Sequence, residues 1–74
     1  MKKTIYSAEH KQLVQKLHEA REKAGLDQIG AAKLLGKSQS YISKIESGQR
    51  RIDLVQLKEF AKIYKKNISY FIPK

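Results

Sequence analysis

The segment of residues 25–53 most constrains the fold, because it encodes two short helices separated by a tight turn. Asp27 can accept hydrogen bonds from the free backbone N–H groups of a helix that begins at Gln28. Gly36 can adopt the left-handed conformation that ends such a helix after Leu35. The sequence therefore predicts a first helix of about two turns, after which the pattern restarts.

The second helix of this segment is predicted from Gln39 to about Ser47. Ser38 is a good N-cap, and Ile42 and Ile45 lie three residues apart on one helical face. The polar side chains left to point outward are Gln39, Ser40, Ser43 and Lys44. This helix therefore has an apolar inner face and a polar, neutral-to-basic outer face.

A longer helix is predicted before this segment, over about residues 8–24. Ser7 can cap it, Glu9 suits its first turn, and Gly25 ends it. Its apolar stripe recurs at four, three and four residues: Leu13, Leu17, Ala20 and Ala24. Residues 1–7 lack such a pattern, so we expect an N-terminal arm followed by one domain over residues 8–74.

A fourth helix is predicted after the segment, from its N-cap Asp53 up to Asn67. Its apolar residues follow three-four spacing: Leu54, Leu57, Phe60, Ala61 and Tyr64. Ser69 can start a last turn through Ile72, which Pro73 would not extend. Since no segment alternates with period two for long enough to form a strand, the fold class is all-α.

The two-helix segment resembles the Cro/repressor-type helix-turn-helix family, also called the XRE family. That family shares the pattern Gly-Leu-Thr-Gln-x-x-x-Ala-x-x-Leu-Gly-x-Ser-Gln-x-x-Ile-Ser-x-Ile-Glu-x-Gly. The matching residues are Gln28, Ala32, Leu35, Gly36, Ser38, Gln39, Ile42, Ser43, Ile45, Glu46 and Gly48. Fitting positions outside the pattern, which extend the resemblance to about residues 13–64, are Arg21, Leu54, Leu57 and Ala61.

The resemblance implies a lambda-repressor-like bundle of four helices plus a short fifth, in which helices 2 and 3 form a helix-turn-helix. It further implies a sequence-specific DNA-binding transcriptional regulator, a repressor that reads the major groove with helix 3. Arg21 and Glu46 fall on an arginine and a glutamate that pair across the domain in this family. A carboxylate facing DNA phosphates would be repelled, so we expect neither residue to contact DNA.

Three residues depart from the family pattern. Asp27 replaces the usual threonine and should cap equally well. Gly30 weakens a helix interior by up to about 1 kcal/mol relative to alanine. Lys37 replaces an apolar turn residue and either adds a positive charge near a bound duplex or is a solvated turn lysine. None of the three removes a feature that DNA reading needs.

Contacts to bases are expected from the start of helix 3, since a recognition helix enters the major groove with its N-terminal residues nearest the bases. The amide of Gln39 can pair with adenine N6 and N7, and Ser40 can bond to a base or to phosphate. Lys44 lies one turn further and reaches a guanine or a phosphate. These three residues are our hypothesis for sequence reading.

Contacts to the DNA backbone are expected from both sides of the motif. Gln28 suits a phosphate contact shared with a helix N-terminus. Tyr41 is expected to pack beside the turn with its edge near phosphate, and for Gln49 and Arg50 a solvated loop remains an alternative. The complete predicted DNA-binding set is Gln28, Lys37, Ser38, Gln39, Ser40, Tyr41, Ser43, Lys44, Gln49, Arg50 and Arg51.

Composition agrees with a small DNA-binding domain. The formal net charge of +9 implies an anionic partner, although residues 1–26, 27–51 and 52–74 each carry +3, so the charge does not locate the binding face. The 74 residues allow one domain, and a hydrophobic content of 41% can supply one compact core. No apolar run approaches a membrane span and no secretory signal is visible, so we expect a cytoplasmic protein.

The sequence shows no group of residues that would catalyse a reaction or bind a metal. Cysteine is absent, which excludes a disulfide or a thiolate metal site. His10 and His18 lie eight residues apart, which is poor spacing for a shared site, and we interpret both as solvated. No serine has a nearby base with a third residue to orient it. We therefore expect no enzyme activity, no cofactor and no metal.

The expected partner is double-stranded DNA, bound by a homodimer, since one small domain covers few base pairs. Tyr70, Phe71 and Ile72 form the predicted dimer patch, with packing back onto helix 1 as the alternative. Two other functions remain open. One is an antitoxin that also neutralises a toxin protein, and the other is a protein-interaction adaptor that kept the fold without reading DNA.

Overall fold

Four α-helices form, and three of them start directly after a predicted capping residue. The computed structural model describes residues 8–72, and within them there is no strand. The elements are α1 (Ala8–Lys23), α2 (Gln28–Leu35), α3 (Gln39–Glu46), α4 (Leu54–Tyr64) and a 3₁₀ turn, η2 (Ile68–Tyr70). The expected arm over residues 1–7, with the Ser7 cap, lies outside the described residues. The all-α bundle of four helices and a short fifth is confirmed.

The helix starts are fixed by the three predicted N-caps. The Asp27 carboxylate accepts a hydrogen bond from the Gly30 backbone N–H at 2.7 Å, and the Ser38 hydroxyl oxygen accepts one from Tyr41 at 3.2 Å. Asp53 accepts from the Gln56 backbone N–H at 2.8 Å, while the Gln56 side chain accepts from the Asp53 N–H at 2.9 Å. Each such cap stabilises its helix by about 1 kcal/mol.

The turn between α2 and α3 depends on Gly36. This residue has a φ of 70°, and its backbone N–H donates to the last carbonyls of α2. A side chain would strain this left-handed conformation, so glycine is the residue that allows α3 to start three residues later, at Gln39. Gly25, which was predicted to end the first helix, also has a positive φ, and so does Gly48 in the turn after α3.

The end of α4 differs from its prediction. The helix stops at Tyr64 rather than continuing to Asn67, because Lys65 adopts a left-handed conformation with a φ of 59°. Its backbone N–H donates to the carbonyls of Ala61 and Lys62, as a terminal glycine would. This conformation costs a residue with a Cβ about 1–2 kcal/mol, and a lysine gives no sign of it in the sequence.

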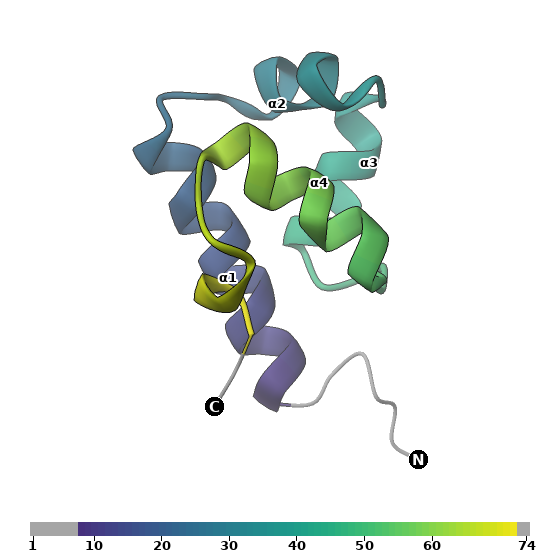
Figure 1. Ribbon diagram of the computed structural model, residues 1–74. Helices are drawn as coiled ribbons and strands as arrows, with labels where there is room; N and C mark the ends of the chain where they lie inside the picture. The colour runs from purple at the N-terminus through teal and green to yellow at the C-terminus, as the bar shows by residue number, and fades with distance from the viewer. Residues whose placement is uncertain (1–7, 73–74) are drawn as a thin grey trace.

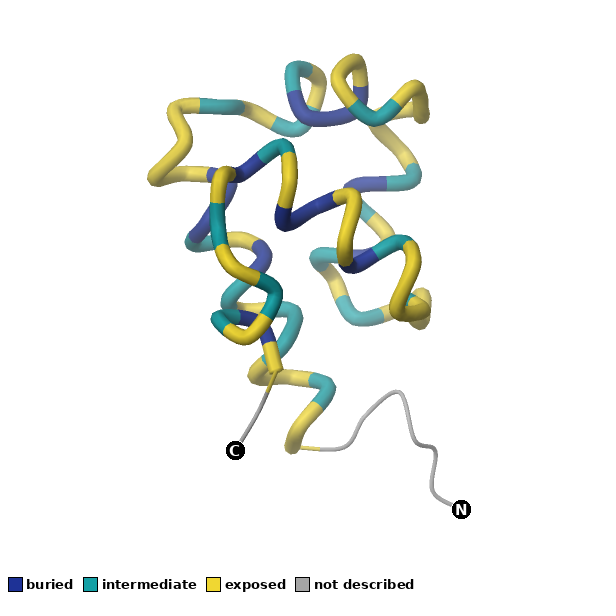
Figure 2. The backbone as a smooth tube through the Cα atoms, viewed as in Figure 1, coloured by how far each residue is buried: buried dark blue, intermediate teal, exposed yellow. Residues whose placement is uncertain are grey.

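The core lies where the inner faces of the helices meet. Figure 1 shows α4 in front, α2 above it, α3 to the right and α1 to the left and below, and in Figure 2 each of these helices contains dark-blue, buried segments. The buried apolar residues are Leu17, Ala20, Ala31, Ala32, Ile42, Ile45, Leu57, Phe60, Ala61, Tyr64 and Phe71. Two residues of the predicted stripes are exposed instead: Ala24, which follows the end of α1, and Leu54, which is 59% exposed at the start of α4.

The C-terminal segment folds back beside α1 (Figure 1). Phe71 is completely buried, and its ring meets the edge of Tyr70 with centroids 5.1 Å apart. The Lys16 ammonium of α1 lies 4.6 Å from the centroid of the Tyr70 ring. The predicted exposed dimer patch is therefore wrong for Phe71, which is buried in the core, and the contact between Lys16 and Tyr70 supports the alternative of packing onto helix 1. Of the three residues, Ile72 is exposed, at 48%.

Candidate nucleic-acid interface

The predicted recognition face of α3 is open to solvent. Ile42 and Ile45 are buried beneath it, which turns the polar side chains of the helix outward. The exposed members of the predicted set are Lys37, Ser38, Gln39, Ser40, Lys44, Gln49, Arg50 and Arg51. The partly buried members are Gln28, Tyr41 and Ser43. The eight exposed side chains are therefore accessible to a duplex.

A chain of hydrogen bonds orients the side chain of Gln39. Its Nε2 donates to Oε1 of Gln28 at 2.6 Å, and Gln28 Nε2 donates to Oε1 of Glu46 at 3.2 Å. An ionised carboxylate can only accept, so Glu46 decides which end of the Gln28 amide faces it. Gln28 Oε1 then faces Gln39, whose own Oε1 and second N–H have no hydrogen-bond partner within residues 8–72. This acceptor and donor pair matches the N6 and N7 edge of adenine.

Glu46 is held in turn by Arg21, as the resemblance implies. Arg21 Nε donates to Oε2 of Glu46 at 2.7 Å, and Nη2 donates to Oε1 at 3.1 Å. Arg21 Nη1 donates to the Leu26 carbonyl at 2.8 Å. The two side chains are only 10% and 7% exposed, so this is a buried bidentate ion pair between α1 and α3.

His18 is exposed, as expected of a solvated histidine, with 46% of its side chain accessible, but it also joins the same cluster. Its Nδ1 lies 3.0 Å from Oε1 of Glu46, and its Nε2 lies 3.2 Å from a carboxylate oxygen of Glu22. The sequence places His18 three residues before Arg21 on the same helical face. This spacing is the signal that could have linked the histidine to the ion pair.

The electrostatics of the cluster favour ionised Glu46. Burial raises the pKa of Glu46, but hydrogen bonds from Arg21, His18 and Gln28 outweigh it, so the net pKa is lowered from 4.5. A carboxylate whose pKa is lower in the folded state stabilises the fold above the unfolded-state pKa. That stabilisation is lost as the pH falls through the folded-state pKa.

The melting temperature should therefore fall as the pH is lowered below about 4.5, and part of this fall should belong to Glu46. The measurement is thermal unfolding by circular dichroism from pH 6 to pH 3 for the wild type, Glu46→Gln and the control Glu59→Gln. Glu46→Gln should be less stable at pH 6 and lose less on acidification, whereas the exposed Glu59 variant should follow the wild type. Parallel curves for the wild type and Glu46→Gln would contradict this prediction.

Tyr41 brings together two cations from opposite ends of α3. The Lys37 ammonium lies 5.3 Å from the ring centroid, and the Arg50 guanidinium lies 5.0 Å from it. The ring itself stacks on Phe60 of α4, with centroids 6.4 Å apart and planes 2° from parallel. Tyr41 thus packs on the core as expected, and burial raises the pKa of its hydroxyl, which stays protonated at neutral pH.

We call Tyr41, Lys37 and Arg50 the Tyr41 cluster. The sequence did not predict it, because Lys37 lies in a turn and Arg50 in a loop. The aromatic face fixes both cations beside the start and the end of α3. Arg50 therefore does not extend freely from its loop.

Within residues 8–72, no helix is long and apolar enough to cross a membrane, and no three His, Cys, Asp or Glu side chains converge as metal ligands would.

Comparisons with known proteins agree with this geometry. A helix-turn-helix family model matches residues 17–71. The restriction-modification controller protein C.AhdI from Aeromonas hydrophila is 32% identical, with a TM-score of 0.75 over 81% of this chain and 87% of that chain. Apo-HppE is 25% identical, with a TM-score of 0.77 over 84% of this chain but only 35% of that chain. No curated protein matches the sequence.

The family match covers more than half of the chain. It includes the second part of α1 and all of α2, α3 and α4. The chain therefore belongs to the XRE-type helix-turn-helix family of DNA-binding transcriptional regulators.

Proposed function

We propose that the protein represses transcription by occupying operator DNA, with α3 in the major groove and without any enzymatic activity. The observation that carries this proposal is the oriented Gln39 amide at the exposed start of α3. Ser40 and Lys44 complete the reading set, and each of them contacts a base or a phosphate. The similarity to a controller protein of a restriction-modification system supports a regulatory role.

We assign the contacts with DNA backbone phosphates to the residues around this reading set. The Arg51 side chain is exposed in the loop after α3, and Lys37 and Arg50 are held against Tyr41. The remaining phosphate contacts are assigned to Gln28, Ser38, Tyr41, Ser43 and Gln49. These contacts hold the domain on the duplex, whereas Gln39 discriminates among sequences.

Useful specificity requires two copies of a domain of this size. We propose a homodimer on half-sites about 34 Å apart along one face of the duplex, acting in the cytoplasm where the DNA is accessible. Selection of bound fragments from a random duplex library tests the arrangement. It should return a two-fold symmetric site whose half-sites are separated by about one helical turn. Selection of a single, asymmetric half-site would contradict the dimer.

The affinity for DNA should depend steeply on salt, because phosphate contacts release counterions. With about 4 to 6 phosphate contacts per subunit, log affinity should fall with log salt with a slope of about −4 to −5 per half-site. The measurement is a fluorescence anisotropy titration of operator and of random duplex at four salt concentrations. The slope should be similar for both duplexes, since phosphates are common to them.

A slope near zero would exclude binding in the groove. Absence of binding to random duplex at low salt would favour a protein-interaction adaptor. An antitoxin would bind its operator with the same salt dependence, and it would differ by forming a complex with a toxin protein.

A further inference from the structure

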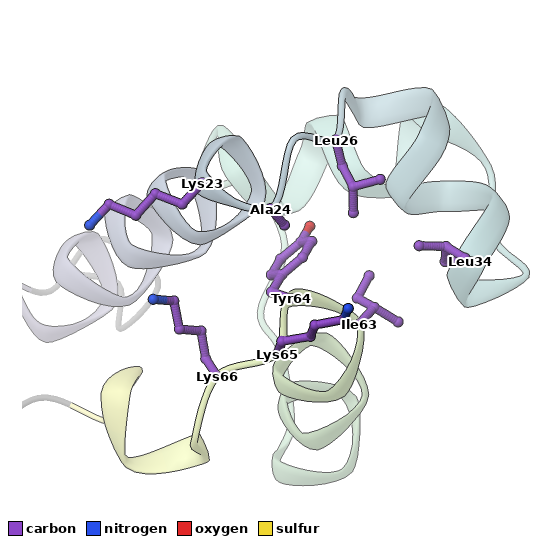
Figure 3. A pocket seen from close by; sticks show the side chains of 8 residues that line it. All are labelled: Lys23, Ala24, Leu26, Leu34, Ile63, Tyr64, Lys65 and Lys66. Carbon is purple, nitrogen blue, oxygen red and sulfur yellow. The ribbon is translucent and has the colours of Figure 1, made fainter.

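A pocket of about 380 Å³ lies between the end of α1, α2 and the end of α4. It is lined by Lys23, Ala24, Leu26, Leu34, Ile63, Tyr64, Lys65 and Lys66 (Figure 3). None of these residues belongs to the predicted DNA-binding set. The volume falls in the range of about 300–1,000 Å³ that is typical of small-molecule sites.

The lining combines apolar walls with a rim of one charge sign. Leu26, Leu34 and Ile63 supply the walls, and Leu34 is 59% exposed although it is apolar. The charged lining residues are three lysines, and no carboxylate lines the pocket. In Figure 3, Lys23 and Lys66 lie on one side of Tyr64, and Lys65 lies on the other. This arrangement attracts an anion and repels a cation.

The Tyr64 hydroxyl is the second feature that points to a ligand. The residue is 3% exposed, and its hydroxyl has no hydrogen-bond partner among the described residues. Figure 3 shows the hydroxyl directed toward Ala24 and Leu26, which also line the pocket. Burial raises the pKa of Tyr64, and the charge of Glu46 raises it further, so the hydroxyl is a donor at neutral pH. A buried donor without an acceptor is unusual in folded proteins.

We propose that this pocket binds a small molecule that has a carboxylate head and a short apolar body. The apolar body lies against Leu34 and Ile63, the carboxylate is neutralised by Lys65 and Lys66, and a carboxylate oxygen accepts the hydrogen bond of Tyr64. A neutral molecule of the same length gains the apolar contacts without the charge and the charge-assisted hydrogen bond.

The test uses octanoate as the probe, at concentrations where it is monomeric, and 1-octanol as the neutral control. Binding is followed on the folded protein through backbone amide NMR shifts. Octanoate should shift the amides of Leu26, Leu34 and Ile63 and bind at least about tenfold more tightly than 1-octanol. Tyr64→Phe removes only the unpartnered hydroxyl, so it should keep the fold and weaken octanoate binding by about tenfold.

Lysine variants separate this site from general attraction to a basic protein. The double variant Lys65→Met/Lys66→Met should weaken octanoate binding by about tenfold, and Lys58→Met, an exposed lysine of α4 outside the pocket, should leave it unchanged. Shifts scattered over the surface, or equal losses in Lys58→Met, would overturn the proposal. So would unchanged binding in Tyr64→Phe. Shifts at the same residues on raising the protein concentration without octanoate would overturn it too, by showing that a second copy covers the pocket.

Discussion

Replacing Glu46 with alanine is expected to lower the free energy of unfolding by about 3–5 kcal/mol, because it leaves the Arg21 guanidinium buried and unpaired. The pair is almost fully buried, with side chains 10% and 7% exposed, so solvent screening does little to reduce this cost. A domain of 74 residues has a total stability of roughly 4–11 kcal/mol. The melting temperature should therefore fall by at least about 12 °C, measured by circular dichroism and urea unfolding.

Two further variants identify the cause of this loss. Glu59→Ala removes an exposed carboxylate from α4 and should change stability by no more than about 0.5 kcal/mol. Arg21→Met combined with Glu46→Leu removes both charges, and it should recover most of the stability that Glu46→Ala loses. Unchanged thermal stability in Glu46→Ala would mean that the ion pair is absent or exposed, and it would reopen a direct DNA contact for Arg21.

The helix starts were predictable because their signals are local. Asp27, Ser38 and Asp53 each bond to a backbone N–H three residues later, so a few neighbouring residues contain all the information needed. The same holds for Gly36, whose left-handed conformation needs no partner elsewhere in the chain. Local signals of this kind located the boundaries of α2 and α3 and the start of α4.

The errors lie where tertiary packing decides. Phe71 belongs to a short apolar run that fits an exposed patch or a docked segment equally well, and only its contact with the rest of the domain buries it. Leu54 fits the spacing of α4 but occupies its first turn, beyond the reach of the core. Lys65 ends α4 in a conformation that its residue type disfavours. Periodicity contains none of this information.

The outward face of α3 was predictable, whereas the contacts that orient its side chains were not. Gln28 and His18 both bond to Glu46, and no sequence pattern predicted either contact. These contacts depend on how α1, α2 and α3 lie relative to one another. The same carboxylate therefore anchors the buried ion pair and orients the Gln28 amide that contacts Gln39, which links the stability of the domain to the geometry of the proposed reading residue.

The second large effect separates reading a sequence from holding DNA. Gln39→Ala should cost about 1–3 kcal/mol on the best operator, flatten the preference at one base pair and leave binding to random duplex nearly unchanged. Arg51→Ala should weaken binding to operator and random duplex alike, and it should make the salt slope shallower by roughly 1 unit. Gln12→Ala, an exposed glutamine of α1, is the matched control and should affect neither.

Titrations of each variant against operator and scrambled duplex at two salt concentrations distinguish these outcomes, and Gln28→Ala adds a check on the hydrogen-bond chain. Gln28 orients Gln39, so the costs of the two alanine variants should be less than additive on the operator. Suppose instead that Gln39→Ala lost affinity equally on both duplexes, or that Arg51→Ala lost it only on the operator. The proposed placement of α3 in the groove would then be wrong, and the reading face would have to shift toward Tyr41 and Lys44, whose side chains lie further along the same helix.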